Sequence, residues 1–390
     1  SERRMEFNEY LKTMVDEDAS DVYLTVAKPP MYRIDGNVRP IGEVNFSAAD
    51  LEKLAAGIMN ERQRKEFAET MEMNLALALP QVARFRVNIF QQRGTVSMVI
   101  RRIKADPMTL AELGLPPVIS DIAMSKRGLA LIVGATGSGK TTTLAAMIDH
   151  RNSSEGGHII TIEDPIEFVH RHKQSIVSQR EVGFDTLSFQ AALKNTLRQA
   201  PDVILIGEIR DTETMEAAIS FAETGHLCLA TLHSNNANQA IERIMNFFPV
   251  ERHAQIYLQL SLNLRAIISQ RLIPSLDEKR VVAMEILLDT PRIKDLIKKG
   301  EVDVLKDAME QGVQEGCQTF DMALFALYVD GRISLEQALV NADSANNLRL
   351  KIKLAGLKVD EDPTDGDSSE PFKAKPEPLQ AARTFRLRKN

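Results

Sequence analysis

Hydrophobic and polar positions follow helical and strand periods in the first third of the chain. Residues 7–15 carry apolar side chains at helical spacing, and two further helices are expected over 47–59 and 62–70. Strands are expected at 21–26 and 30–34. The segments 84–90 and 96–103 alternate with period two around Arg93 and Gly94, which predicts an antiparallel hairpin. Together these elements predict an α+β domain over residues 5–105. Residues 1–4 are expected to precede a natural start at Met5.

A different pattern begins at residue 128, where short, wholly apolar runs alternate with helical segments. Strands are expected at 128–133, 158–163, 202–207 and 226–233, and a helix at 141–150 follows the first of them. Alternation of this kind predicts a parallel sheet covered by helices, here a RecA-like α/β domain over residues 128–357. The proline-containing segment 106–127 is the expected interdomain linker. Between residues 249 and 356 we expect helices, with a strand at 280–287.

Composition adds limits to this picture. Residues 358–390 are rich in Asp, Ser and Pro, so we expect a disordered tail with a solvated basic end. A net charge of −6 offers no general attraction for nucleic acid. The two cysteines, Cys228 and Cys317, can build neither a disulfide framework nor a four-cysteine zinc module. No signal peptide and no apolar run of about 20 residues is found, which favours a cytoplasmic protein.

The sequence from Gly134 to Thr141 fits the phosphate-binding pattern G-x-x-x-x-G-K-[ST] at every fixed position. Glycines let backbone N–H groups surround phosphate oxygens, the lysine adds a positive charge, and the threonine hydroxyl can bind Mg²⁺. An apolar strand precedes the pattern and a helix follows it, as this kind of site requires. We therefore expect ATP to bind through Ala135, Thr136, Gly137, Ser138, Gly139, Lys140, Thr141 and Thr142, with Mg²⁺ as its metal.

Acidic residues end two of the expected core strands. Glu208 follows the strand 202–207 and is the candidate for orienting the attacking water. Gly207 stands where a Mg²⁺-binding Asp is usual, so the metal needs another carboxylate. Glu163, in the segment TIEDPIEF, is the candidate, with Glu208 and Thr141 completing the expected metal set. Glu167 could orient water.

Histidine and arginine supply further candidates. His233 ends the strand 226–233 and suits a sensor of the γ-phosphate, whereas His226 could be structural. Arg86 and Arg101 lie on the two strands of the N-terminal hairpin, and phosphoryl transfer benefits from an arginine supplied by a neighbouring domain or subunit. For the arginines at 84, 93 and 102, a solvent-facing charge is an equally good interpretation.

In this order, GATGSGKTTT, TIEDPIEF, ILIGEIRD and TGHLCLATLHS resemble the secretion-type hexameric ATPases, and within them the type IV pilus retraction ATPases of the PilT/PilU family. The resemblance covers residues 5–357. It implies a PAS-like N-terminal domain, a RecA-like C-terminal domain and a ring at the inner-membrane base of the pilus machine. The segment 292–300 differs from the PilT signature in that region, and with the extended Asp/Pro-rich tail this points to the accessory PilU branch.

The resemblance also implies roles and partners. Glu208 matches the catalytic glutamate of the family, and Arg86 and Arg101 match arginines that act on nucleotide across the ring. The expected assembly is a homo-hexamer that works with a PilT-like retraction ATPase and an inner-membrane platform protein similar to PilC. Two alternatives stay open: a non-hydrolysing structural subunit of such a motor, and a nucleic-acid translocase on the same core.

Overall fold

The N-terminal domain is an antiparallel sheet covered by three helices. The computed structural model describes residues 6–79 and 83–356, so the expected tail at 358–390 lies outside the described residues. The strands are ordered β3-β2-β1-β6-β5-β4. The elements of this domain are α1 (Phe7–Asp16), β1 (Asp21–Leu24), β2 (Met31–Ile34), β3 (Asn37–Pro40), α2 (Ala48–Ile58), α3 (Glu61–Thr70), β4 (Glu72–Leu79), β5 (Ala83–Gln92) and β6 (Thr95–Ala105).

Local sequence explains these elements. The Ser47 hydroxyl accepts the backbone N–H of Asp50 at 3.3 Å, and Asp50 accepts the N–H of Ser47 at 2.9 Å, which satisfies free donors at the start of α2. In β5, buried Phe85, Val87 and Ile89 alternate with more exposed residues, as period two requires. The hairpin expected at 84–103 is confirmed, whereas β4 was not predicted.

The second domain contains a seven-stranded sheet in the order β10-β8-β11-β12-β7-β13-β14, parallel except for the final pair. Its strands are β7 (Gly128–Val133), β8 (Gly157–Glu163), β10 (Ser175–Glu181), β11 (Val203–Ile206), β12 (Leu227–Leu232), β13 (Leu264–Pro274) and β14 (Arg280–Leu288). The helices that surround them are α4 (Val118–Ala123), α5 (Lys140–Ser154), α6 (Phe189–Thr196), α7 (Thr212–Glu223), α8 (Ala237–Asn246) and α9 (His253–Asn263), and the short strand β9 (Phe168–Val169) lies outside this sheet.

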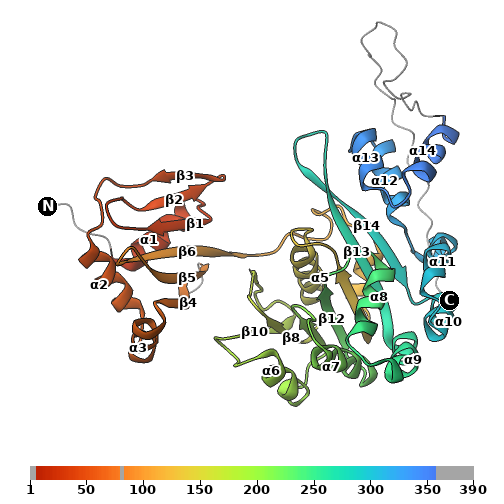
Figure 1. Ribbon diagram of the computed structural model, residues 1–390, viewed down its shortest axis with the longest axis horizontal. Coiled ribbons are helices and arrows are strands. Elements are labelled where there is room, and N and C mark those ends of the chain that lie inside the picture. The colour runs from red at the N-terminus through yellow and green to blue at the C-terminus, as the bar shows by residue number, and fades with distance from the viewer. Residues whose placement is uncertain (1–5, 80–82, 357–390) are drawn as a thin grey trace, which may run out of the picture.

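Helices complete the chain, at the blue end of Figure 1. They are α10 (Pro291–Lys299), α11 (Leu305–Gln311), α12 (Phe320–Val329), α13 (Leu335–Asn341) and α14 (Ala345–Leu354), and 3₁₀ turns occur at η1 (Leu197–Gln199), η2 (Val250–Arg252), η3 (Val302–Val304) and η4 (Val313–Glu315). None of the helices in the described part of the chain has the length and apolar character needed to cross a membrane. The predicted fold class, an α+β domain followed by an α/β domain with a helical extension, is confirmed.

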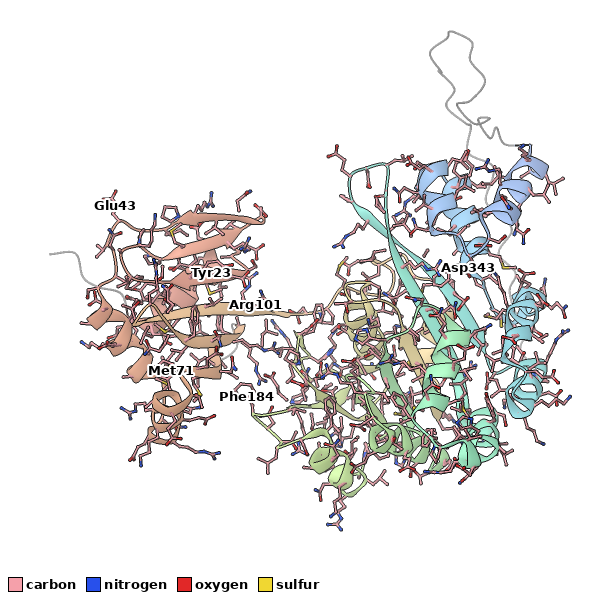
Figure 2. The ribbon with its side chains drawn as sticks, viewed as in Figure 1. Tyr23, Glu43, Met71, Arg101, Phe184 and Asp343 are labelled. Atoms are coloured by element: carbon pink, nitrogen blue, oxygen red, sulfur yellow. The ribbon has the colours of Figure 1, made fainter. Side chains whose placement is uncertain are left out.

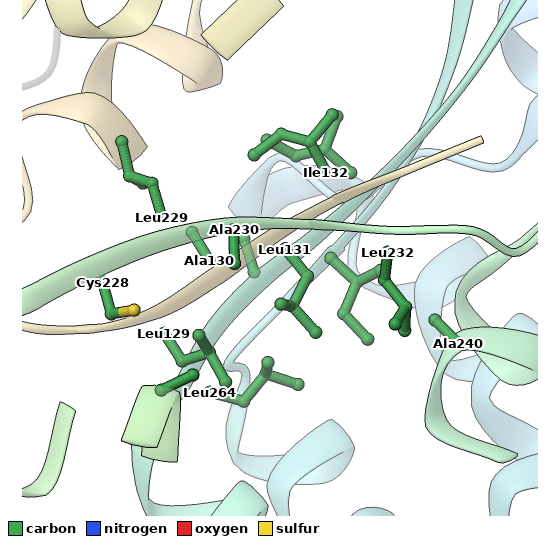
Figure 3. Close-up of a cluster of buried hydrophobic side chains, with 14 of the residues drawn as sticks. Leu129, Ala130, Leu131, Ile132, Cys228, Leu229, Ala230, Leu232, Ala240 and Leu264 are labelled. Atoms are coloured by element: carbon green, nitrogen blue, oxygen red, sulfur yellow. The ribbon is translucent and has the colours of Figure 1, made fainter. Parts of the chain in front are cut away.

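The core of the second domain lies on both faces of the central strands. Every residue of β7 and β12 is buried, and Figure 3 shows the side chains of Leu129, Leu131, Cys228 and Leu232 packed around these strands. Strands buried on both faces read as continuous apolar runs, which is why both were visible in the sequence. Their rigid packing fixes the loops at their carboxyl ends.

Residues 249–356 were expected to be mainly helical with one strand, at 280–287, and this expectation missed β13. This strand runs parallel to β7 and antiparallel to β14, where Ile267 and Ile268 are fully buried. A long apolar stretch without alternation does not separate a buried strand from a buried helix, and the helix α9 ends at Asn263 immediately before it. The edge strand β10 was also not predicted.

The short strand β9, which follows β8 in the chain, pairs with a strand of the N-terminal domain. In β9, Phe168 and Val169 pair in parallel with Lys104 and Ala105 at the end of β6. Figure 1 shows β6 running from the N-terminal domain toward the second domain. The acidic segment that precedes β9 is therefore tied to the N-terminal domain.

Candidate functional site

The expected phosphate loop lies between β7 and α5. Gly134, Gly137 and Gly139 have φ values of +156°, +78° and +89°, in the region that favours glycine. A Cβ at Gly134 would lie 2.4 Å from the Ser138 Oγ and 2.8 Å from the Gln270 carbonyl oxygen. The loop can therefore close tightly only with glycine at this position, which leaves its backbone N–H groups free to face a ligand.

A cavity of about 510 Å³ opens beside this loop. The expected ATP-binding residues that line it are Thr136, Gly137, Gly139, Lys140, Thr141 and Thr142; Ala135 and Ser138 do not. Lys140 Nζ donates to the carbonyl oxygens of Gly134 and Ala135, each at 2.9 Å. Burial lowers the pKa of Lys140, and nearby Glu208 partly opposes that shift. An anion in the cavity would restore the charge that burial disfavours.

The candidate acids and His233 form another wall of the same cavity, called the acidic wall below. Glu163, Glu167, Glu208 and His233 all line it, although they come from three different parts of the chain. The reason is topological, because β8, β11 and β12 are parallel neighbours of one sheet and their carboxyl ends share one edge. The structure thus brings together the phosphate loop and these four residues.

Glu163 is held in a poorly solvated environment. Its Oε2 accepts hydrogen bonds from the Thr161 hydroxyl at 2.6 Å and the Gln179 amide at 3.1 Å. Burial raises the pKa of Glu163 to about 7, and these two hydrogen bonds partly oppose the shift. A carboxyl group of this kind can bind a proton or a metal ion near neutral pH. Together with the Thr141 hydroxyl it offers the oxygen ligands that Mg²⁺ prefers, so the residues fit the expected metal.

Gly207 explains why Glu163 can occupy this wall. A Cβ at Gly207 would approach the Cα of Glu163 and the carbonyl oxygen of Ile162 at 3.2 Å each. Both atoms belong to the backbone of β8, which cannot move aside cheaply. The position that usually carries the metal-binding Asp therefore has little room for a side chain, and Glu163, whose backbone lies against it at the end of the adjacent strand, carries a carboxylate.

Both oxygens of Glu208 are engaged within the chain. Oε1 lies 2.9 Å from His233 Nε2, and Oε2 accepts Arg210 Nε at 2.8 Å and Nη2 at 2.6 Å. The carboxylate of Glu208 is also the main reason that the pKa of Arg210 is raised. By contrast, His226 contacts Thr224 and Phe221 at the opposite end of β12, away from this wall. The arrangement can position one carboxylate against a bound phosphate.

Arg86 and Arg101 are not in this cavity. Arg86 Nη2 donates to the Ile166 carbonyl oxygen at 2.7 Å, and Arg101 Nε pairs with Asp21 at 2.8 Å. Both line a second cavity of about 570 Å³ that also includes Phe184. Figure 2 shows Arg101 and Phe184 at the boundary between the two domains. Within one chain, these arginines therefore face the boundary between the domains.

Sequence reasoning missed two supports of the site. Gln270 on β13 is 2% exposed, and its Nε2 donates to the Ser138 carbonyl oxygen at 2.7 Å, which fixes the back of the phosphate loop. Gln179 on β10 bonds Glu163 and also the Phe168 carbonyl oxygen at 2.8 Å. Neither glutamine belongs to a motif, and both lie on strands that were not predicted. A correct strand assignment would have placed them beside the site.

Comparisons with known proteins agree with this geometry. Residues 3–351 match the family described as type II/IV secretion system protein. The chain is 54% identical over 359 residues to the type IV pilus ATPase PilU of Pseudomonas aeruginosa, covering 92% of this chain and 94% of that protein. It is 44% identical to the type IV pilus retractation ATPase PilT of the same organism, covering 88% and 100%.

A solved structure shows the same similarity in three dimensions. The crystal structure of the pilus retraction motor PilT with bound ADP superposes with a TM-score of 0.82 at 41% sequence identity. The match covers 89% of this chain and 100% of that one. Fold and nucleotide-binding architecture are therefore shared with a protein that binds ADP.

Proposed function

The chain belongs to the type II/IV secretion system protein family, and we propose that it is an ATPase motor subunit that powers type IV pilus retraction. The observation that carries this proposal is the single cavity in which Lys140 and Thr141 face Glu163, Glu208 and His233. The greater identity to PilU than to PilT, 54% against 44%, favours the accessory role that the sequence signature also suggests.

The chain's own residues divide the work of hydrolysis. Lys140 and the loop N–H groups would bind the phosphates of ATP. Mg²⁺ would neutralise charge on the phosphate oxygens, held by Thr141 and Glu163, directly or through water. His233 would contact the γ-phosphate, and it also orients Glu208 through the 2.9 Å contact. Glu208 would then accept a hydrogen bond from the attacking water.

Glu208 must first release one of its two present partners. The side chain of Arg210 is 59% exposed and that of Glu208 is 18% exposed, so water can replace the Arg210 contact. The exposed guanidinium of Arg210 keeps its hydration when this contact opens, which limits the cost of opening. Arg86 and Arg101 are proposed to serve the nucleotide of the adjacent subunit, since in this chain they do not reach the cavity of their own domain.

The proposed assembly is a homo-hexamer in the cytoplasm, at the inner-membrane base of the pilus machine. Its proposed partners are a PilT-like retraction ATPase and a PilC-like platform protein. Ordered Lys140, Thr141 and Glu208 in one cavity do not favour a purely structural subunit, and the net charge of −6 does not favour a nucleic-acid translocase.

Mg²⁺-dependent ATP hydrolysis by the purified chain, over a series of protein concentrations, tests the proposal. Specific activity should rise with concentration as rings assemble. Glu208→Gln and Lys140→Ala should each lower kcat/KM by about 100-fold or more, and only Lys140→Ala should also weaken ADP binding. Hydrolysis that both variants leave unchanged would contradict the assignment. A silent wild type that becomes active with a PilT-like partner would support the accessory role.

A further inference from the structure

Glu181 is a buried carboxylate that the proposed hydrolysis does not use. It ends β10, and its side chain is 1% exposed. Its Oε2 accepts the backbone N–H of Ile166 at 3.1 Å and lies 3.4 Å from Arg86 Nη2. Arg84 Nη2 approaches the same oxygen at 3.8 Å. A buried carboxylate is costly unless its charge is paired, and the two positive charges near Glu181 come from Arg84 and Arg86 of the N-terminal domain.

The same contacts hold Ile166, in the acidic segment TIEDPIEF, through both its backbone N–H and its carbonyl oxygen. Glu181 binds the N–H of Ile166, and Arg86 donates to its carbonyl oxygen at 2.7 Å. The Ile166 side chain is fully buried. Glu181, Arg86 and Ile166 therefore form a closed triangle, which we call the Ile166 clamp.

The clamp sits in the middle of a short segment with an anchor at each end. At one end Glu163 lines the ATP cavity, and its carbonyl oxygen accepts the N–H of Val182 at 2.9 Å. At the other end β9 pairs with the end of β6. Between them, Asp164 and Pro165 line both the ATP cavity and the cavity between the domains. A displacement of the N-terminal domain therefore pulls on the segment that carries Glu167 and joins Glu163 at the end of β8 to β9.

We propose that Glu181 is a positioning residue that couples the orientation of the N-terminal domain to the acidic wall of the ATP site through the Ile166 clamp. Arg86 cannot remain in the clamp while it acts on the nucleotide of an adjacent subunit. The clamp therefore opens when Arg86 is delivered and closes when it returns, so the acidic wall is set by the position of the N-terminal domain. The catalytic half of this inference rests on the proposed ATPase function, whereas the domain-linking half does not.

Distance measurement between spin labels tests the domain-linking half without any hydrolysis. Lys53→Cys on α2 and Lys194→Cys on α6 place labels on exposed positions of the two domains, and the natural Cys228 and Cys317 are buried. Labelled full-length chain is mixed with excess unlabelled chain, so that each assembly carries at most one labelled subunit. Glu181→Gln should broaden the distance distribution relative to wild type.

A matched variant separates coupling from simple loss of stability. Glu285 is also a buried carboxylate, 2% exposed, but its partners Ala237 and Ser269 belong to its own domain. Glu285→Gln should leave the distance distribution as in wild type. Arg86→Gln should broaden it as Glu181→Gln does, and the double variant should broaden it no further, because both changes remove one clamp.

ATP hydrolysis tests the catalytic half. Glu181→Gln should lower kcat by about 10- to 100-fold, since a displacement of up to about 1 Å at the acidic wall misaligns the reacting groups, while KM for ATP stays within about twofold. A distance distribution identical to wild type overturns the inference, and so does a fall in kcat without a change in that distribution. A wild type that is inactive under every condition would instead contradict the proposed function, and the distance measurement would still decide whether the clamp exists.

Discussion

The raised pKa of Glu163 makes the stability of the nucleotide-free protein depend on pH in a defined direction. Burial raises this pKa from 4.5 to about 7, so the folded state binds the proton more tightly than the unfolded state. The stabilisation is fully present below pH 4.5, declines as the pH rises, and is lost above the folded pKa of about 7. Replacing the group with glutamine should remove this dependence.

The magnitude follows from the two pKa values. One unit corresponds to about 1.4 kcal/mol, so a shift from 4.5 to about 7 corresponds to roughly 3–4 kcal/mol at most. Most of it is spread below neutral pH, and about 1 kcal/mol remains to be lost between pH 6 and pH 8. Thr161→Val should move the decline to higher pH, because the Thr161 hydroxyl lowers the pKa of Glu163 by donating to its carboxylate.

Urea unfolding at a series of pH values measures this effect as a difference between two proteins. Other groups titrate in the same range, so the free energy of unfolding of Glu163→Gln is subtracted from that of wild type at each pH. Glu155→Gln, at a half-exposed carboxylate that pairs with Arg151, is the control and should give a flat difference. A flat difference for Glu163→Gln between pH 5 and pH 8 would show that this carboxyl group is ionised throughout, and the argument from burial would fail.

Gln270 and Gly207 lead to further predictions. Gln270→Met leaves the phosphate-loop carbonyl without its buried donor, at a cost of about 1–3 kcal/mol. ADP affinity measured by calorimetry should fall, whereas Gln318→Met, which removes a similar 2.8 Å bond to the Met284 carbonyl oxygen, should destabilise the fold and leave ADP affinity unchanged. Gly207→Ala forces a Cβ against the backbone of β8 and should cost about 1–3 kcal/mol in urea unfolding. Gly156→Ala, whose Cβ would meet one atom at 3.7 Å, should cost less, and equal costs would contradict the steric argument.

The sequence was most informative where a residue type has one dominant physical reason. The phosphate loop needs glycine at Gly134 because any Cβ would clash, and the pattern could be recognised without the structure. The wholly buried strands β7 and β12 were equally visible, since nothing but apolar residues suits both of their faces. Motifs and continuous apolar runs therefore predicted the two walls of the ATP cavity.

Contacts between distant segments could not be predicted in this way. The strand β13 has an apolar sequence compatible with either helix or strand, and its assignment depends on β7 and β14 lying on either side. Because β13 was not predicted, Gln270 was not recognised as the residue behind the phosphate loop. Arg86 was a candidate on the sequence alone, but its partners Glu181 and Ile166 are 95 and 80 residues away. No local pattern records such a pairing.

Gly207 and Glu163 are best understood together. In the sequence, a glycine at the usual position of a metal-binding acid looks like a lost ligand. In the structure, the missing side chain leaves β11 close against β8, so that the Glu163 backbone lies within 3.2 Å of where a Cβ would be. An Asp at 207 would need the volume that β8 now fills, and a Glu at 163 would then carry a second buried negative charge beside it. The end of β11 therefore carries a glycine, and the carboxylate at this edge of the sheet is that of Glu163 on the neighbouring strand β8. The segment that follows β8 contains Ile166, which Arg86 of the N-terminal domain contacts in the Ile166 clamp.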